Sequence, residues 1–333
     1  MVKNILIFGH ANIGDVCYDL AVINPLCRAF PQAKISFLTS SRCRDFVQGY
    51  KGITQIITFD RHGKDKGFSG HVRFIARLRQ EKFDMAVFLT RSLAYWFLGI
   101  PQVWCVKKSA REPKHPVDRY LSLLRSHGVE ANSASFDYNL DRREDGFCAD
   151  FCKQHGIGPD DVVVGIMPLA AWSLKSWPIQ RWNSLVEVLT GQYGIKVINL
   201  GKMPDNELGK RIAKEMSVRI IPADQTTLAQ AKALLKRCRI FIGPDSSLLH
   251  VASCMRVETI GLYGPTSGEN FYPYFHRHNV LSAHKRLPCM PCYPGTEASC
   301  CTGEKKCDFG PCMDAIRVED VVALVREKLK VPG

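Results

Sequence analysis

The chain has 333 residues, a length that indicates roughly two domains. Hydrophobic residues make up 46% and charged residues 23%, values typical of a globular protein with sizeable cores. The longest apolar runs fall short of the roughly 18 residues of a membrane span, and residues 1–8 lack the features of a signal peptide, so we expect a cytoplasmic protein. The net charge of +13 favours an anionic partner, but the basic blocks at 61–66 and 106–111 are typical of loops, which argues against nucleic acid.

Strands and helices alternate through the first part of the chain. Short apolar runs predict strands at 3–9, 34–39, 53–59, 84–89 and, less clearly, 103–106. Apolar residues at helical spacing predict helices at 16–30, 42–48, 71–82 and 117–127. This alternation is typical of a parallel, doubly wound sheet. Polar residues from about 133 to 145 lack periodicity and predict the crossing between two domains.

After a predicted helix at 146–155, a second alternating series begins with the strand 162–167. Further strands are predicted at 196–200, 218–221, 240–242 and 257–263. Helices are predicted at 178–193, 206–216, 228–237, 247–254 and 318–329. We therefore predict an α/β protein with two Rossmann-like doubly wound domains that face each other across a cleft. The predicted divisions are 1–155, then 160–316 with a Cys-rich loop at 288–312, then a C-terminal helix at 317–333.

Two loops of the second domain suit a phosphate-bearing ligand. Each follows the carboxyl end of a predicted strand, where open parallel sheets bind ligands. Hydroxyls, backbone N–H groups and a helix N-terminus are the groups that bind phosphate in such loops. The residues are Asp245, Ser246, Ser247 and His250 in one loop and the helix after it, and Gly264, Pro265 and Thr266 in the other.

The loop after the first strand raises two alternatives. Its sequence, Gly9-His-Ala-Asn-Ile-Gly14, lacks the middle glycine of G-x-G-x-x-G, and no acid follows the second strand, so nicotinamide-dinucleotide binding is disfavoured. Asp15 comes next, in the first turn of a predicted helix. The helix dipole alone accounts for an acid at that position. The alternative is a general base at the mouth of the cleft, and this loop alone does not decide between the two.

Four motifs occur in order along the chain. They are Gly14-Asp15-Val16, Lys175-Ser-Trp-Pro-Ile-Gln-Arg-Trp182, Asp245-Ser-Ser-Leu-Leu-His250 and Gly264-Pro-Thr266. Each motif alone is weak, but their order and separation resemble glycosyltransferase family 9, the heptosyltransferases of lipopolysaccharide inner-core assembly. The resemblance covers residues from about 3 to 275 and implies the GT-B architecture. It therefore agrees with the two domains predicted from periodicity.

The resemblance implies an inverting transfer in which Asp15 is the general base for the acceptor hydroxyl. Lys175 would neutralise the leaving nucleoside diphosphate, so no metal cofactor is required. Asp205 matches the family's acid for the ribose hydroxyls. The other implied donor-binding residues are Asp245, Ser246, Ser247, His250, Gly264, Pro265 and Thr266.

Several of these residues also have purely structural interpretations. Lys175 could be a surface Lys before a helix, and His250 could tie its helix to a neighbouring loop. Asp205 could be a helix N-cap. Trp177 and Trp182 are better explained by packing than by ligand contact.

The chain also departs from the family pattern. His10-Ala-Asn-Ile13 replaces the more usual Ser-rich approach to Gly14-Asp15. Residues 168–171 read Pro-Leu-Ala-Ala where the family usually has Pro-Gly-Ala or Pro-Gly-Ser, and Ser247 replaces a Gly. These departures leave the donor sugar more open than the reaction class.

Six cysteines lie close together near the C-terminus: Cys289, Cys292, Cys300, Cys301, Cys307 and Cys312. The first pair has the C-x-x-C spacing of zinc sites, but the later spacings form no second such pair. A structural zinc on Cys289, Cys292, Cys307 and Cys312 is one hypothesis, and labile or packed thiols are the other. The eight remaining cysteines are scattered, as expected for small buried side chains in a reducing compartment.

The resemblance thus predicts transfer of a sugar, heptose from ADP-heptose, to a lipopolysaccharide inner-core acceptor. We expect an anionic, lipid-linked saccharide acceptor near Asn12, Gly14, Arg61 and Lys64, and peripheral association with the inner face of the membrane. A different nucleotide sugar, a non-catalytic nucleotide-sugar-binding or assembly protein, and a Rossmann oxidoreductase are the alternatives. Undiminished sugar transfer on replacing Asp15 with Asn would favour the non-catalytic alternative, whereas tight NAD(P) binding would favour the oxidoreductase.

Overall fold

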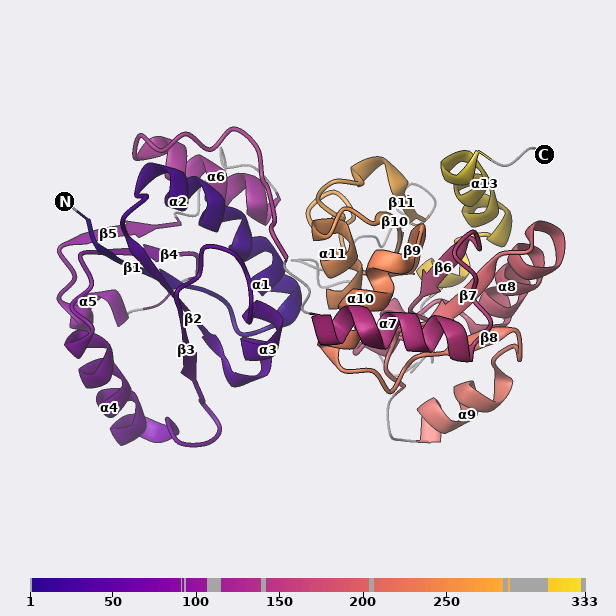
Figure 1. Cartoon of the computed structure of the whole chain (residues 1–333), viewed down its shortest axis with the longest axis horizontal. Coiled ribbons are helices and arrows are strands. Elements are labelled where there is room, and N and C mark those ends of the chain that lie inside the picture. The colour runs from indigo at the N-terminus through magenta and orange to yellow at the C-terminus, as the bar shows by residue number, and fades with distance from the viewer. Residues whose placement is uncertain are drawn as a thin grey trace. The chain divides into compact units, whose positions relative to one another are not determined.

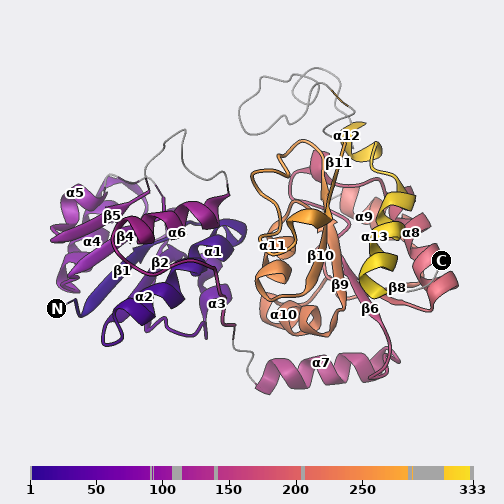
Figure 2. The same cartoon turned by 90° about the horizontal axis from the view of Figure 1, so that it is seen from above.

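The computed structural model describes residues 2–90, 92, 94–106, 115–138, 142–203, 207–283, 287 and 311–330. It forms two compact units, Met1–Asn139 and Leu140–Gly333 (Figure 1). No helix in these ranges is both long and apolar enough to cross a membrane. The boundary between the units differs from the predicted division at 155. Helix α7 (Arg142–Gln154) belongs to the second unit because it packs along α10 (Leu228–Arg237), as Figure 2 shows.

The first unit is built on a five-stranded parallel sheet with the order β3-β2-β1-β4-β5. Its strands are β1 (Asn4–Phe8), β2 (Lys34–Ser40), β3 (Gln55–Phe59), β4 (Met85–Phe88) and β5 (Gln102–Cys105). Ile5 of β1 pairs with Ile35 on one side and with Met85 on the other. All five predicted strands are therefore confirmed, with their ends shifted by a few residues.

Helices cover both faces of this first sheet. They are α1 (Ile13–Asp19), α2 (Ile23–Ala29), α3 (Arg44–Val47), α4 (Gly67–Gln80), α5 (Ala94–Leu98) and α6 (Pro116–Ser126). Helices α4 and α5 bury Phe74, Leu78 and Leu98 against the strands. The predicted single helix 16–30 is instead interrupted by a 3₁₀ turn at Leu20–Val22. Pro25 explains the break because it has no N–H to donate to a preceding turn and is tolerated in the first turn of α2.

The second unit has a six-stranded parallel sheet with the order β11-β10-β9-β6-β7-β8. The strands are β6 (Val163–Ile166), β7 (Lys196–Asn199), β8 (Ile220–Pro222), β9 (Ile240–Pro244), β10 (Glu258–Tyr263) and β11 (Val280–Ser282). The remaining helices are α8 (Ile179–Tyr193), α9 (Glu207–Glu215), α11 (Ser247–Cys254), α12 (Pro311–Asp314) and α13 (Val318–Leu329). Strand β11 and helix α12 were not predicted, because segments of three and four residues give no readable period.

Both sheets run outward in two directions from their first strand. In the first unit the chain passes from β1 to β2 and β3 on one side and then to β4 and β5 on the other. In the second unit β6 and β9 are the corresponding neighbours. Loops that leave two such strands diverge, and the crevice between them is where open α/β sheets bind ligands. The fold therefore places one candidate site after β1 and another after β6 and β9.

Candidate functional site

The second unit brings together Lys175, Asp245 and His250. Lys175 Nζ lies 2.8 Å from Asp245 Oδ2 and also donates to the Asp245 carbonyl at 3.3 Å. His250 Nε2 lies 2.9 Å from Asp245 Oδ1. The contacts join the loop after β6 to the loop and helix after β9, at the point where the strand order reverses. The structure therefore assembles three residues that the motifs predicted separately.

Packing in the loop after β6 fixes where Lys175 lies. Ser176 is fully buried, and its hydroxyl accepts a hydrogen bond from Ala170 N at 3.0 Å. The Trp177 indole donates to Ile316 O at 3.1 Å and meets the Trp182 ring edge-on, with 5.1 Å between ring centroids. Both indoles are buried, which confirms that they are packing residues. Lys175 is thus the last residue of the 3₁₀ turn Ser173–Lys175, and the buried Ser176 and Trp177 that follow it fix its position.

Charge favours the ionised form of Asp245. Burial alone would raise the pKa of this carboxyl, but the hydrogen bond and charge of His250, together with the charge of Lys175, hold it well below its ordinary value. Burial, followed by the charge of Asp245, raises the pKa of Tyr263 well above its usual range. Tyr263 is therefore a neutral phenol that donates to Phe271 O at 2.6 Å.

The geometry refines the expected roles of these groups. The Asp245 side chain is only 10% exposed, and each of its oxygens has a cationic or imidazole partner, so it is better suited to anchoring Lys175 and His250 than to holding sugar hydroxyls. Of the two roles expected for His250, the structure shows the contact with its loop. Lys175 is 22% exposed, and Asp245 engages two of its three N–H donors. With respect to the described residues, one donor therefore remains for a ligand.

Ser246 and Ser247 begin α11. Ser246 is the N-cap residue, but its hydroxyl points to Met167 Sδ at 3.2 Å and makes no capping hydrogen bond. Met167 directly follows β6, and its backbone N–H donates to Ile242 O of β9 at 3.0 Å. In the sequence, Met167 is only the last residue of the predicted strand 162–167, since nothing in an apolar run distinguishes the member that reaches the crevice.

The loop after β10 contains Gly264, Pro265 and Thr266, all of them buried. A Cβ on Gly264 would lie 2.5 Å from Met313 Sδ, so only glycine fits there without displacing the Met313 side chain. Thr266 is 2% exposed, and its hydroxyl has no hydrogen-bond partner among the described residues. A buried hydroxyl without a partner costs free energy, and a ligand that accepts its hydrogen bond would remove that cost.

In the first unit, Asp15 lies in the first turn of α1, after the loop that follows β1. Asn12, the N-cap residue, donates to Asp15 Oδ2 at 3.4 Å, and Gly14 is the second residue of the helix. The loop is fixed by Thr39, whose hydroxyl donates to His10 O at 2.6 Å. Asp15 is partly exposed at the reversal point of the first sheet, as expected for a group that acts on a ligand.

A second ion pair, which was not predicted, lies beneath this loop. Asp19 is fully buried, and both of its oxygens face His10: Oδ2 accepts from His10 N at 2.7 Å, and Oδ1 lies 2.8 Å from His10 Nδ1. Burial lowers the pKa of His10, but the hydrogen bond and charge of Asp19 outweigh it, so the pKa of His10 is raised. The signal in the sequence was an acid inside the apolar run 16–23, which requires a buried partner.

The structure does not bring the predicted acceptor residues Arg61 and Lys64 into contact with Asp15. Both are exposed in the loop after β3, on the same edge of the sheet but two strands from β1. They stay predictions, together with Asn12 and Gly14.

Asp205, Cys289, Cys292 and Cys307 lie outside the described residues, so their proposed roles stay predictions. Cys312 belongs to α12 and is 3% exposed in the core. In the described ranges, no group of three or more His, Cys, Asp or Glu residues could hold a metal ion.

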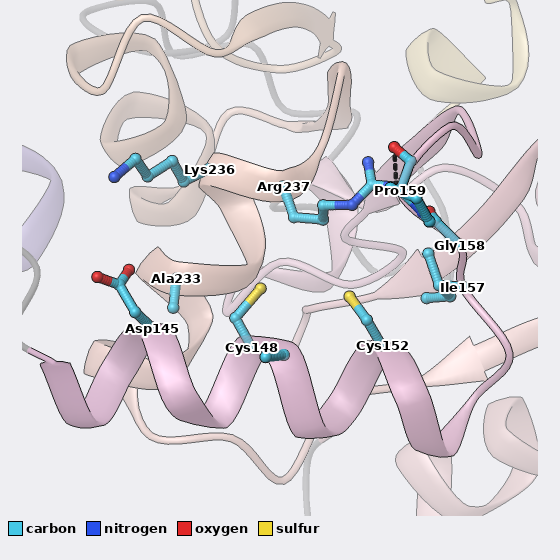
Figure 3. A pocket seen from close by; sticks show the side chains of 10 residues that line it. Asp145, Cys148, Cys152, Ile157, Gly158, Pro159, Ala233, Lys236 and Arg237 are labelled. Atoms are coloured by element: carbon cyan, nitrogen blue, oxygen red, sulfur yellow. Dashed lines mark hydrogen bonds between the residues drawn. The ribbon is translucent and has the colours of Figure 1, made fainter.

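A pocket of about 400 Å³ lies at the opposite edge of the second sheet, between α7 and the end of α10 (Figure 3). Cys148 and Cys152 of α7 face it, and Arg237 closes one side by donating to Gly158 O at 2.7 Å. Burial, followed by the neighbouring thiol of Cys152, raises the pKa of Cys148 to about 11. A protonated thiol is a poor nucleophile and metal ligand.

Two Rossmann-like units, each with polar residues at its reversal point, are the architecture typical of GT-B glycosyltransferases. A profile of glycosyltransferase family 9 (heptosyltransferase) matches residues 100–299, more than half of the chain. The protein belongs to glycosyltransferase family 9. The matched segment includes the Lys175, Asp245 and Thr266 loops but not Asp15.

Individual relatives extend the similarity over most of the chain. Lipopolysaccharide heptosyltransferase 2 from Escherichia coli is 24% identical over 311 residues, which cover 83% of this chain and 87% of that protein. A family 9 glycosyltransferase from Veillonella parvula superposes with a TM-score of 0.83 at 21% identity and covers 99% of this chain and 98% of that one. The E. coli ADP-heptose lipopolysaccharide heptosyltransferase II superposes with a TM-score of 0.73 at 21% identity and covers 98% of each chain. These superpositions confirm the predicted fold.

Proposed function

We propose that this glycosyltransferase transfers heptose from ADP-heptose to an anionic, lipid-linked saccharide of the lipopolysaccharide inner core. Membership of the heptosyltransferase family supports the reaction class, and the names of the E. coli relatives support heptose, ADP and lipopolysaccharide. The observation that carries the proposal is the Lys175–Asp245–His250 arrangement at the reversal point of the second sheet.

The donor diphosphate is proposed to bind where the loops after β6, β9 and β10 converge. The remaining N–H of Lys175 would meet a phosphate oxygen, and the start of α11 at Ser247 adds unpaired backbone N–H groups and the positive end of a helix dipole. The buried hydroxyl of Thr266 would gain the acceptor that it lacks among the described residues. Asp205 is proposed to hold the ribose hydroxyls.

The proposed transfer is a single in-line displacement with Asp15 as general base. The acceptor oxygen forms a bond to the anomeric carbon as the bond from that carbon to the phosphate oxygen breaks. The hydroxyl proton passes to the Asp15 carboxylate, and ADP leaves with its electron pair. Lys175 offsets the negative charge that develops on the diphosphate, and the configuration at the anomeric carbon is inverted.

The acceptor is proposed to lie over the first unit, with Asn12 and Gly14 near its reacting hydroxyl and Arg61 and Lys64 near its anionic groups. A lipid-linked acceptor requires the enzyme to work at a membrane surface, and the proposed location is the cytoplasmic face of the inner membrane. Anionic lipid and an anionic acceptor both suit a chain with a net charge of +13.

The test uses purified protein, ADP-heptose and a heptose-free inner-core acceptor, with product mass and released ADP as readouts. We expect transfer by the wild type and its loss in Asp15→Asn, while thermal stabilisation by ADP-heptose persists in both. Thermal shifts with UDP-, GDP- and CMP-sugars serve as the comparison. Stabilisation by one of these sugars but not by ADP compounds would refute the donor, and full transfer by Asp15→Asn would refute the base.

A further inference from the structure

An exposed helix in the first unit combines apolar and basic side chains. Phe68 is 87% exposed and Val72 is 51% exposed, although both belong to the 14-residue helix α4. The buried face of this helix is formed by Gly70, Phe74 and Leu78. Residues two positions away lie about 200° around a helix, so Phe68 and Val72, one turn apart, point directly away from the sheet.

The charge of α4 has one sign. The sequence of Gly67–Gln80 contains Arg73, Arg77 and Arg79 but no Asp or Glu. Within the described residues, none of these three side chains forms an ion pair. Arg73 donates to Lys64 O. Arg77 donates to Thr58 O, and its guanidinium lies over the Phe74 ring. Lysines precede the helix at 64 and 66 and follow it at 82. An outward apolar stripe in a basic surround is typical of helices that bind anionic bilayers.

The preceding loop presents this helix rigidly. Asp65 is buried, and its carboxylate accepts from Asp60 N at 2.9 Å. A Cβ on Gly70 would lie 2.4 Å from the Asp65 carbonyl carbon, so the loop packs directly on the helix backbone. Phe68 thus projects from a well-packed turn, and its exposure is not the result of a frayed helix end.

The topology puts Phe68 on the same edge of the sheet as Asp15. Helix α4 follows β3 and Asp15 follows β1, and both strands run parallel in the order β3-β2-β1 (Figure 1). Strands lie about 4.8 Å apart, so the two strands are about 10 Å apart across the sheet. A bilayer against the start of α4 would therefore lie at the same edge of the sheet as the proposed general base.

We infer that α4 docks the enzyme on an anionic phospholipid bilayer, with Phe68 and Val72 inserted among the lipids and the arginines on the headgroups. Helix α5 packs on α4 and has two further exposed aromatic side chains. Trp96 is 71% exposed and Phe97 is 64% exposed. The inference rests on the lipid-linked acceptor of the proposed function, but the docking itself requires neither donor nor acceptor.

The experiment is flotation of the full chain with vesicles of phosphatidylcholine alone or mixed with phosphatidylglycerol, without any acceptor. We expect binding to the mixed vesicles only, weakened about tenfold or more in Phe68→Ser/Val72→Ser. We expect about fivefold weaker binding for each arginine changed to Gln and a steep dependence on salt. The matched control is Val218→Ser, since Val218 is a fully exposed valine of the second unit.

Several results would overturn the inference. These are no binding of the wild type to anionic vesicles, unchanged binding of the Phe68/Val72 variant, or an equal loss in Val218→Ser. A dimer in lipid-free solution that the Phe68/Val72 variant dissociates would instead make this face a protein interface. The wild type and the Phe68/Val72 variant should transfer sugar to a water-soluble acceptor at equal rates. With a vesicle-bound acceptor, the variant should be slower than the wild type. If the wild type transferred sugar to neither acceptor, the proposed function would be refuted, but the flotation result would still test the docking of α4.

Discussion

Replacing Asp245 with Asn is expected to destabilise the second unit by about 3 kcal/mol. Removing one partner of a buried ion pair typically costs about 3–5 kcal/mol, because the other partner is left buried without its counter-charge. Lys175 is 22% exposed and can regain water, whereas His250 is only 6% exposed and cannot, which places the cost at the lower end of that range. Lys175→Met should cost only about 1 kcal/mol, since Asp245 keeps its contact with His250.

The measurement is urea unfolding at neutral pH followed by tryptophan fluorescence, to which the buried Trp177 and Trp182 of this unit contribute. The pH dependence gives a second check. Because the folded pKa of Asp245 is lowered, its contribution to stability is present above the ordinary Asp pKa of about 4 and is lost as the pH falls through the lower folded value. The difference between wild type and Asp245→Asn should therefore be present at neutral pH and shrink below about pH 4. A difference below about 0.5 kcal/mol at neutral pH, or a larger cost for Lys175→Met, would refute the reasoning.

Three further predictions concern other parts of the chain. Because Asp19 raises the pKa of His10, this pair should stabilise the first unit below the ordinary His pKa of about 6.5. That contribution should be lost as the pH rises through the higher folded pKa of His10. Unfolding measured at a series of pH values should show this dependence in the wild type but not in Asp19→Asn. Gly264→Ala should cost about 1–3 kcal/mol by thermal unfolding, since its Cβ would meet Met313, and Met313→Ala in the same chain should recover part of that loss. Cys238 is buried, and its thiol pKa is raised by burial, so it should resist iodoacetamide in the folded protein and react in urea, as peptide mass mapping would show; rapid labelling of the native protein would contradict this.

Local pattern was enough to predict the two sheets and the loops that contain the site. Continuous apolar runs such as Ile5–Ile7 and Phe241–Ile242 have no polar side to expose, so they indicate strands covered on both faces. Alternation with helices then implies parallel strands, and parallel strands put Asp15, Lys175 and Asp245 at sheet edges without any knowledge of tertiary contacts.

Long-range pairing was beyond the reach of the sequence. Nothing near His10 indicates that both oxygens of Asp19 will face it, because that depends on how α1 packs beneath the loop. Similarly, Asp245 was expected to be a donor-binding residue, and nothing in its loop indicates that its side chain faces Lys175, 70 residues away. The contact-based boundary after Asn139 also differs from the predicted division at 155, since the contact that assigns α7 to the second unit involves a helix more than 70 residues further along the chain.

The ion pair between Lys175 and Asp245 has a consequence for the order of folding. The two residues are separated by 70 positions, and the intervening chain forms β7, β8 and the three helices that accompany them. Closing so long a loop costs conformational entropy that is not offset until contacts form within it. Strand β9 should therefore pair with β6 only after the intervening segment has folded. The ion pair would then be among the last contacts of this unit to form, and a chain still emerging from the ribosome could not bind donor until β9 and α11 had been synthesised.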